Sequence, residues 1–97
     1  MTRRVMNRLR ELRLARGLTQ EQLATELDVT RHTILALEVG RYVPSIELAL
    51  RLAAFFDDPL ENIFWLADDE TAALRRRGAR YVAVQELAEE PGHATTE

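Results

Sequence analysis

Apolar residues recur at every third or fourth position along most of the chain before residue 67, which is the period of a helix with one buried face. Residues that begin or end helices stand between these segments. Thr19, Thr30 and Ser45 each precede an apolar segment and can cap it by accepting a hydrogen bond from a backbone N–H. Gly17 and Gly40 follow such segments and can adopt the left-handed conformation that ends a helix. The pattern predicts a series of short helices joined by tight turns.

Five helices are predicted in residues 1–66, which are expected to form one compact domain. They cover approximately residues 5–16, 20–27, 31–39, 46–56 and 60–66. Four of them place residues on one face at helical spacing: Val5, Leu9, Leu12 and Arg16 in the first, and apolar residues in the other three, namely Leu23, Ala24 and Leu27 in the second, Ile34 and Leu37 in the third, and Ile46, Ala49, Leu52, Ala53 and Phe56 in the fourth. Asp28 is expected in the left-handed conformation between the second and third helices, where Asp is tolerated less well than Gly.

The segment 67–77 is expected to form a further helix, because its acidic start and its basic end complement the helix dipole. Residues 80–88 fit either a helix or a strand, and helix is favoured. Residues 91–97 are expected to be a flexible tail. We therefore predict a C-terminal extension over residues 67–90 that contacts a second copy of the chain or a protein partner.

The composition excludes several classes of protein. Cysteine is absent, which rules out disulfides and thiolate chemistry. His32 and His93 are not spaced as metal ligands, and no glycine-rich phosphate loop is present, so we expect neither an enzyme nor a cofactor or metal. No apolar stretch approaches the roughly 18 residues that a membrane span needs. The arginines at the N-terminus are not followed by the apolar segment of a secretory signal, and a cytoplasmic location is expected.

Charge is distributed unevenly along the chain. Residues 1–45 hold eight arginines against five acidic residues, whereas residues 46–97 hold five arginines against eleven acidic residues. This division favours a basic working face with an acidic remainder, although a short chain can divide its charge unevenly by chance. The overall net charge of −3 departs from the basic character expected of a nucleic-acid-binding protein.

The second and third predicted helices are joined by about three residues, which is the helix-turn-helix arrangement. In that arrangement the second helix enters the major groove of DNA with its N-terminal residues toward the base edges. Five apolar side chains can share one core beneath the pair: Leu23, Ala24, Val29, Ile34 and Leu37. The side chains left outside are those of Gln20, Arg31, His32, Leu35 and Ala36.

Four ordered blocks carry a resemblance to a known family: "GLTQEQLA", "VTRHTI", "LEVGRYVPS" and "LALRLAAFF". With them, the chain from about Asn7 to Leu66 resembles the lambda-repressor/Cro-type DNA-binding domains of the Xre family, in particular its short single-domain bacterial or phage regulators. The resemblance implies an all-α, compact five-helix domain. It also implies a sequence-specific transcriptional regulator, expected to be a repressor, that binds a palindromic operator in double-stranded DNA as a homodimer.

The resemblance also implies roles for single residues. Base reading falls to Arg31, His32, Leu35 and Ala36. An arginine can pair bidentately with guanine, whereas an apolar side chain can contact only a thymine methyl. An exposed Leu35 would therefore mean modest direct readout, or a contact with protein.

Contacts with phosphate, or positioning, fall to Gln20, Thr33, Arg41 and Tyr42. Gln20 is also expected to brace the head of the third helix, and the alternative is a solvated helix start. Thr33 can instead help to cap the third helix, and Tyr42 can instead pack over Pro44.

Two further pairs complete the set of expected sites. Arg13 and Glu38 match a pair that joins the first and third helices of related phage repressors by an ion pair. Phe64 and Trp65 are neighbours on the short fifth helix and cannot both face inward, so one of them is expected in a dimer interface. The alternative for these rings is a place in the core beneath the C-terminal segment.

A different function remains open at this stage. The protein could be an antitoxin that covers a toxin with its C-terminal extension, or an adaptor whose partner contacts Leu35. An adaptor would bind no DNA at any salt concentration.

Overall fold

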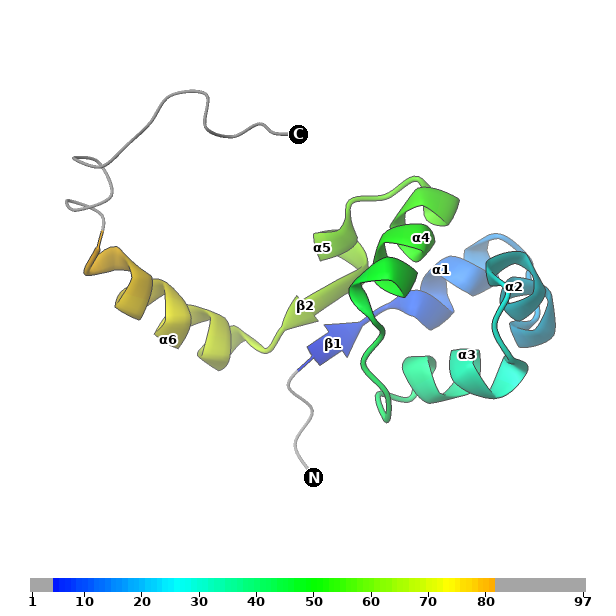
Figure 1. Ribbon diagram of the computed structural model, residues 1–97, viewed down its shortest axis with the longest axis horizontal. Helices are drawn as coiled ribbons and strands as arrows, with labels where there is room; N and C mark the ends of the chain where they lie inside the picture. Colours follow the sequence, from blue (N-terminus) through cyan, green and yellow to red (C-terminus); the bar gives the residue numbers. More distant parts are fainter. Residues whose placement is uncertain (1–4, 82–97) are drawn as a thin grey trace. The chain divides into compact units, whose positions relative to one another are not determined.

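The computed structural model describes residues 5–81, which fall into two units that divide between Ala67 and Asp68. Six helices and two short strands lie within these residues (Figure 1). The first unit contains β1 (Val5–Asn7), α1 (Leu9–Ala15), α2 (Gln20–Leu27), α3 (Arg31–Glu38), α4 (Ile46–Phe56), α5 (Leu60–Ile63) and β2 (Phe64–Leu66). The second unit contains α6 (Asp68–Ala79). None of the helices in the described part is long and apolar enough to cross a membrane.

Helices α2, α3 and α4 begin where their capping residues predict. The Thr19 hydroxyl accepts a hydrogen bond from the Gln22 N–H at 3.0 Å, and the Gln22 side chain accepts from the Thr19 N–H at 2.8 Å. These two bonds form the capping box predicted for α2. Thr30 and Ser45 cap α3 and α4 in the same way, each accepting a backbone N–H at 3.1 Å.

A left-handed residue ends α2 and turns the chain toward α3. Asp28 has φ 58°, as predicted, and the Val29 N–H donates to the carbonyl of Ala24 at 3.0 Å. Gly40 has φ 81° after α3, and Asp57 has φ 52° after α4. Side chains with a Cβ rarely adopt this conformation, so the turns at both aspartates hold some strain.

The core of the first unit lies where α1 to α5 meet. Ala24 is 2% exposed, and this small residue allows α2 and α3 to pack closely. The largest side chains that are fully buried are Leu9, Leu23, Ile34, Leu37, Leu52 and Ile63. The inward faces predicted for the second and third helices are confirmed.

Strands β1 and β2 correct the expectation of an all-α fold. They pair antiparallel, with Val5 opposite Leu66, Met6 opposite Trp65 and Asn7 opposite Phe64. The predicted helix from residue 5 starts only at Leu9, and the predicted helix to residue 66 ends at Ile63. The strands were not predicted because each one pairs with residues about 60 positions away in the sequence. Local periodicity contains no information about such a distant partner.

One predicted core position is also wrong. Ile46 is 71% exposed, because it is the first residue of α4 and lies beyond the core, and Leu48 is buried instead. Arg16, which was expected to be exposed, is exposed. Its guanidinium donates to the carbonyl of Phe56 at 2.9 Å and lies 5.4 Å from the centre of the Phe56 ring.

Helix α6 is slightly longer than the predicted segment and includes Gly78, which was expected just beyond its end. None of its residues is buried. Arg80 and Tyr81 form a turn after it. The remainder of residues 80–88, whose structure was predicted ambiguously, and the predicted tail over residues 91–97 lie outside the described residues.

Candidate nucleic-acid interface

Helix α3 turns one face into the core and leaves its first two residues exposed. Ile34 and Leu37 are both fully buried and fix the inward face of the helix. Arg31 and His32 are exposed at its N-terminal end, immediately after the Thr30 cap. An arginine and a histidine therefore stand where side chains of a helix in the major groove reach base edges.

The second turn of α3 is less accessible than the first. Leu35 and Ala36, the other two predicted base-reading residues, are half-buried. Leu35, which was expected outside the core, is therefore only partly exposed. Both side chains still offer apolar surface at which a thymine methyl could pack.

A buried ion pair holds the C-terminal end of α3 against α1. Arg13 Nε lies 2.6 Å from Glu38 Oε2, and Arg13 Nη2 lies 3.2 Å from Glu38 Oε1. The two side chains are 8% and 2% exposed. Arg13 Nη1 also donates to the carbonyl of Leu18 at 2.7 Å. This bidentate geometry ties α1 and α3 together as the resemblance implies.

Gln20 makes a contact with α3, but with a different part of it than expected. Its Nε2 donates to Glu38 Oε1 at 3.1 Å, so it braces the last residue of α3 and not the head of the helix. Thr33 is half-buried, and its hydroxyl lies 3.0 Å from that of Thr30. Both polar groups therefore have partners within the protein.

Arg41 and Tyr42 follow α3 in the loop that leads to α4, and both are exposed. The Arg41 N–H donates to the carbonyl of Ala36 at 2.9 Å, which fixes the backbone where the loop leaves the helix. Tyr42 is 43% exposed. Both side chains can reach solvent on the loop that continues from α3.

Asn7 makes two side-chain hydrogen bonds that were not predicted from the sequence. Its Nδ2 donates to the carbonyl of Leu37 at 2.9 Å, and its Oδ1 accepts from the Leu9 N–H at 2.9 Å. The first bond reaches α3 from β1, and the second holds the N–H of Leu9, the first residue of α1. The second bond spans two residues and is of the local kind that asparagine side chains make with the backbone. The bond to Leu37 joins distant parts of the chain and left no local signal.

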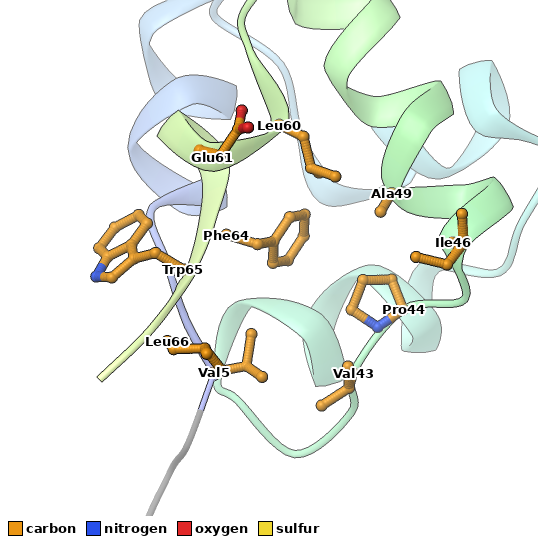
Figure 2. A pocket seen from close by; sticks show the side chains of 10 residues that line it. All are labelled: Val5, Val43, Pro44, Ile46, Ala49, Leu60, Glu61, Phe64, Trp65 and Leu66. Carbon is orange, nitrogen blue, oxygen red and sulfur yellow. The ribbon is translucent and has the colours of Figure 1, made fainter. Parts of the chain in front are cut away.

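Phe64 and Trp65 lie on β2, not on a helix, so their side chains point to opposite sides of the strand (Figure 2). Phe64 points toward Leu60 and Ala49, and Trp65 points away from them. Phe64 is half-buried and Trp65 is 38% exposed. The two rings face opposite ways because side chains alternate along a strand, and the helix on which the expectation rested is not formed at these residues.

Beside β2 lies a hollow of about 420 Å³, which we call the apolar groove. Its lining consists of Val5, Val43, Pro44, Ile46, Ala49, Leu60, Glu61, Phe64, Trp65 and Leu66. Val43 is 60% exposed and Ile46 is 71% exposed. Large aliphatic side chains with such exposure, gathered around an apolar hollow, are typical of a surface that another molecule covers.

Comparisons with known proteins agree with this geometry. The sequence model of the family described as helix-turn-helix matches residues 9–61. An uncharacterized HTH-type transcriptional regulator of Methanocaldococcus jannaschii is 48% identical over 64 residues, which are 66% of this chain and 97% of that protein. The cryptic phage CTXphi transcriptional repressor RstR of Vibrio cholerae is 35% identical over 65 residues, which are 67% of this chain and 57% of that protein.

A solved structure is also similar. The restriction-modification controller protein C.AhdI from Aeromonas hydrophila superposes with a TM-score of 0.51 at 37% identity, over 56% of this chain and 78% of that one. The names of the related proteins are those of regulators, which agrees with a role other than catalysis. The family match spans both α2 and α3, and the chain belongs to the helix-turn-helix family as an Xre-type, DNA-binding transcriptional regulator.

Proposed function

We propose that the protein represses transcription by binding a palindromic operator as a homodimer, with α3 of each copy in the major groove. The observation that carries the proposal is the asymmetry of α3. Its first two residues, Arg31 and His32, are exposed, whereas a buried ion pair holds its last residue. A helix fixed at one end and accessible at the other is suited to reading base edges.

In this arrangement the side chains on α3 and the following loop have different tasks. Arg31 donates to guanine, His32 to a base acceptor or the adjoining backbone, and Leu35 and Ala36 pack against thymine methyls. Arg41 and Tyr42 bind phosphates beyond the end of α3 and set the register on the duplex. Gln20 and Thr33 contribute mainly by positioning, because both already bond to protein groups.

The homodimer forms through the apolar groove. An isologous dimer brings the same patch of both copies together, so a projecting side chain of one copy must find a hollow in the other. The groove offers both, because Val43 and Ile46 project beside the hollow that Phe64 lines. Trp65 lies at its border, and tryptophan is enriched where interfaces derive most of their energy.

Repression is the direction of regulation that we infer. A dimer that covers a promoter operator excludes the polymerase without needing any further domain. A related protein, RstR, is named a transcriptional repressor, which supports the same direction.

Selection from a random double-stranded DNA library tests the proposed function. We expect enrichment of an inverted repeat whose half-sites lie about 10 base pairs apart, centre to centre, one turn of the duplex. Recovery of single half-sites would argue for a monomer. If folded protein in excess enriches no sequence at about 50 mM salt, DNA recognition is refuted and an adaptor role becomes the better explanation.

A further inference from the structure

The backbone carbonyl of Leu37 in α3 accepts a hydrogen bond from β1, a strand that lies outside the helix-turn-helix. Asn7 Nδ2 donates to it at 2.9 Å. Asn7 is the last residue of β1 and lies opposite Phe64 in the register of the two strands. The next residue, Arg8, donates its backbone N–H to the carbonyl of Ile63 at 3.1 Å. The backbone of Asn7 is therefore fixed by the strand pair, and its side chain holds α3.

The bond is not needed to satisfy the carbonyl of Leu37. The Gly40 N–H donates to the same oxygen at 3.1 Å. Loss of the asparagine amide would therefore leave this acceptor with a partner, and it would escape the desolvation penalty of an orphaned group. What the protein would lose is a mechanical connection between β1 and α3.

That connection is one of three at the C-terminal end of α3, and each comes from a different element. Arg13 of α1 and Gln20 of α2 hold the carboxylate of Glu38. Asn7 of β1 holds the backbone one residue earlier. The contacts of Arg13 and Gln20 act on α3 through the Glu38 side chain, whereas Asn7 holds the helix backbone directly.

The exposed first residues of α3 amplify any rotation of the helix. Arg31 lies about 9 Å along the axis from Leu37, at 1.5 Å per residue. A tilt of about 10° at the tethered end would therefore displace the first turn by roughly 1.5 Å. Base recognition tolerates displacements of about 0.5 Å, so the tether matters for reading bases more than for contacts with phosphates.

We propose that Asn7 is a positioning residue that fixes the orientation of α3 for base reading. Through β1 it also connects α3 to β2, where the proposed dimer surface lies. The inference rests on the proposed function, and it adds that discrimination between sequences depends on a side chain that touches no DNA.

The test compares Asn7→Ser with wild-type protein, using the full chain. The serine hydroxyl can still accept the Leu9 N–H but is too short to reach the carbonyl of Leu37. Binding to the selected operator and to a scrambled duplex of equal length is measured by fluorescence anisotropy. We expect the operator affinity to fall by roughly three- to tenfold, while the affinity for scrambled DNA is unchanged.

The matched control is Asn62→Ser, which removes an asparagine amide that donates to Asp58 Oδ1 at 2.9 Å on the surface of the same domain. It should leave the ratio of the two affinities unchanged. If Asn7→Ser does not fold, Asn7→Thr replaces it, because the threonine hydroxyl can also accept the Leu9 N–H and is also too short to reach the carbonyl of Leu37.

Two results would overturn the inference. One is a folded Asn7 variant whose ratio of operator affinity to scrambled-DNA affinity is unchanged, and the other is an equal fall in affinity for both duplexes. Failure of the proposed function is a separate result, since wild-type protein would then show no preference for any DNA sequence.

Discussion

Single residues on and after α3 are expected to divide between sequence reading and affinity. Arg31 is exposed at the head of the helix, and Arg41 is exposed on the loop after it. Arg31→Ala should cost about 1–3 kcal/mol per half-site on the operator and much less on scrambled DNA. Arg41→Ala should weaken binding to both duplexes similarly. It should also reduce the salt dependence of binding by an amount that corresponds to about one phosphate contact. Titrations at several salt concentrations check both effects. If Arg31→Ala weakened binding to both duplexes equally, Arg31 would be a phosphate ligand.

Stability at the residue scale should depend strongly on Arg13. Arg13→Ala leaves the carboxylate of Glu38, which is 2% exposed, without its charged partner and should cost on the order of 3 kcal/mol. Arg16→Ala serves as a control, because it removes one bond to the Phe56 carbonyl and should cost about 1 kcal/mol. Thermal unfolding measures the difference, which corresponds to a gap of roughly 10 °C in melting temperature. Equal melting temperatures would contradict it.

Residue roles were predictable from sequence where a motif fixes them. The pairing of Arg13 with Glu38 follows from a family pattern, and the geometry at 2.6 Å agrees with it. The bond from Asn7 and the contact of Gln20 with Glu38 were not predictable in this form. Both depend on how side chains of separate elements converge, which the spacing along the chain does not encode.

At the scale of elements, the turn between α2 and α3 is expected to be sensitive to backbone strain. Asp28 has φ 58°, where a β-branched side chain is strained. Asp28→Val should therefore destabilise the domain by about 1–2 kcal/mol, and Asp28→Gly should be neutral or stabilising. Denaturant unfolding compares the two, with Thr25→Val on the exposed face of α2 as a control. An equal effect of valine and glycine at this position would refute the argument.

Element boundaries were predicted well wherever a capping side chain acts locally. The starts of α2, α3 and α4 follow from Thr19, Thr30 and Ser45, whose bonds reach only three residues ahead. β1 and β2 were missed because each has three residues, too few to show an alternating pattern. The assignment of Ile46 to the core was wrong for a related reason. Periodicity identifies the face of a helix that points inward, but it does not show that the first residue of α4 lies beyond the core.

For the whole molecule, the apolar groove should control the association of two copies. Ile46 is 71% exposed, so Ile46→Glu should leave the fold of one copy intact and should place a charge in the proposed interface. Leu14→Glu is the matched control, since Leu14 is 51% exposed on α1 and does not line the groove. Sedimentation should find monomers for Ile46→Glu and dimers for both wild type and Leu14→Glu.

The single tryptophan provides a second measurement of the same interface. Trp65 borders the groove, and its emission should shift on dilution as copies separate. Trp65→Ala should likewise favour monomers. An unchanged dimer in both the Ile46→Glu and Trp65→Ala variants would place the interface elsewhere on the chain.

The pairing of β1 with β2 has a consequence for synthesis of the chain. A ribosome releases Val5 early, but its partner Leu66 only after α1 to α5 have been made. Helices α2 and α3, whose contacts are close in sequence, can therefore assemble on the nascent chain before the strands meet, because local contacts close short loops quickly. Asn7 acquires its opposite residue, Phe64, only with this late step. While Phe64 has not yet left the ribosome, the nascent chain can thus hold a formed helix pair whose final orientation is not yet fixed.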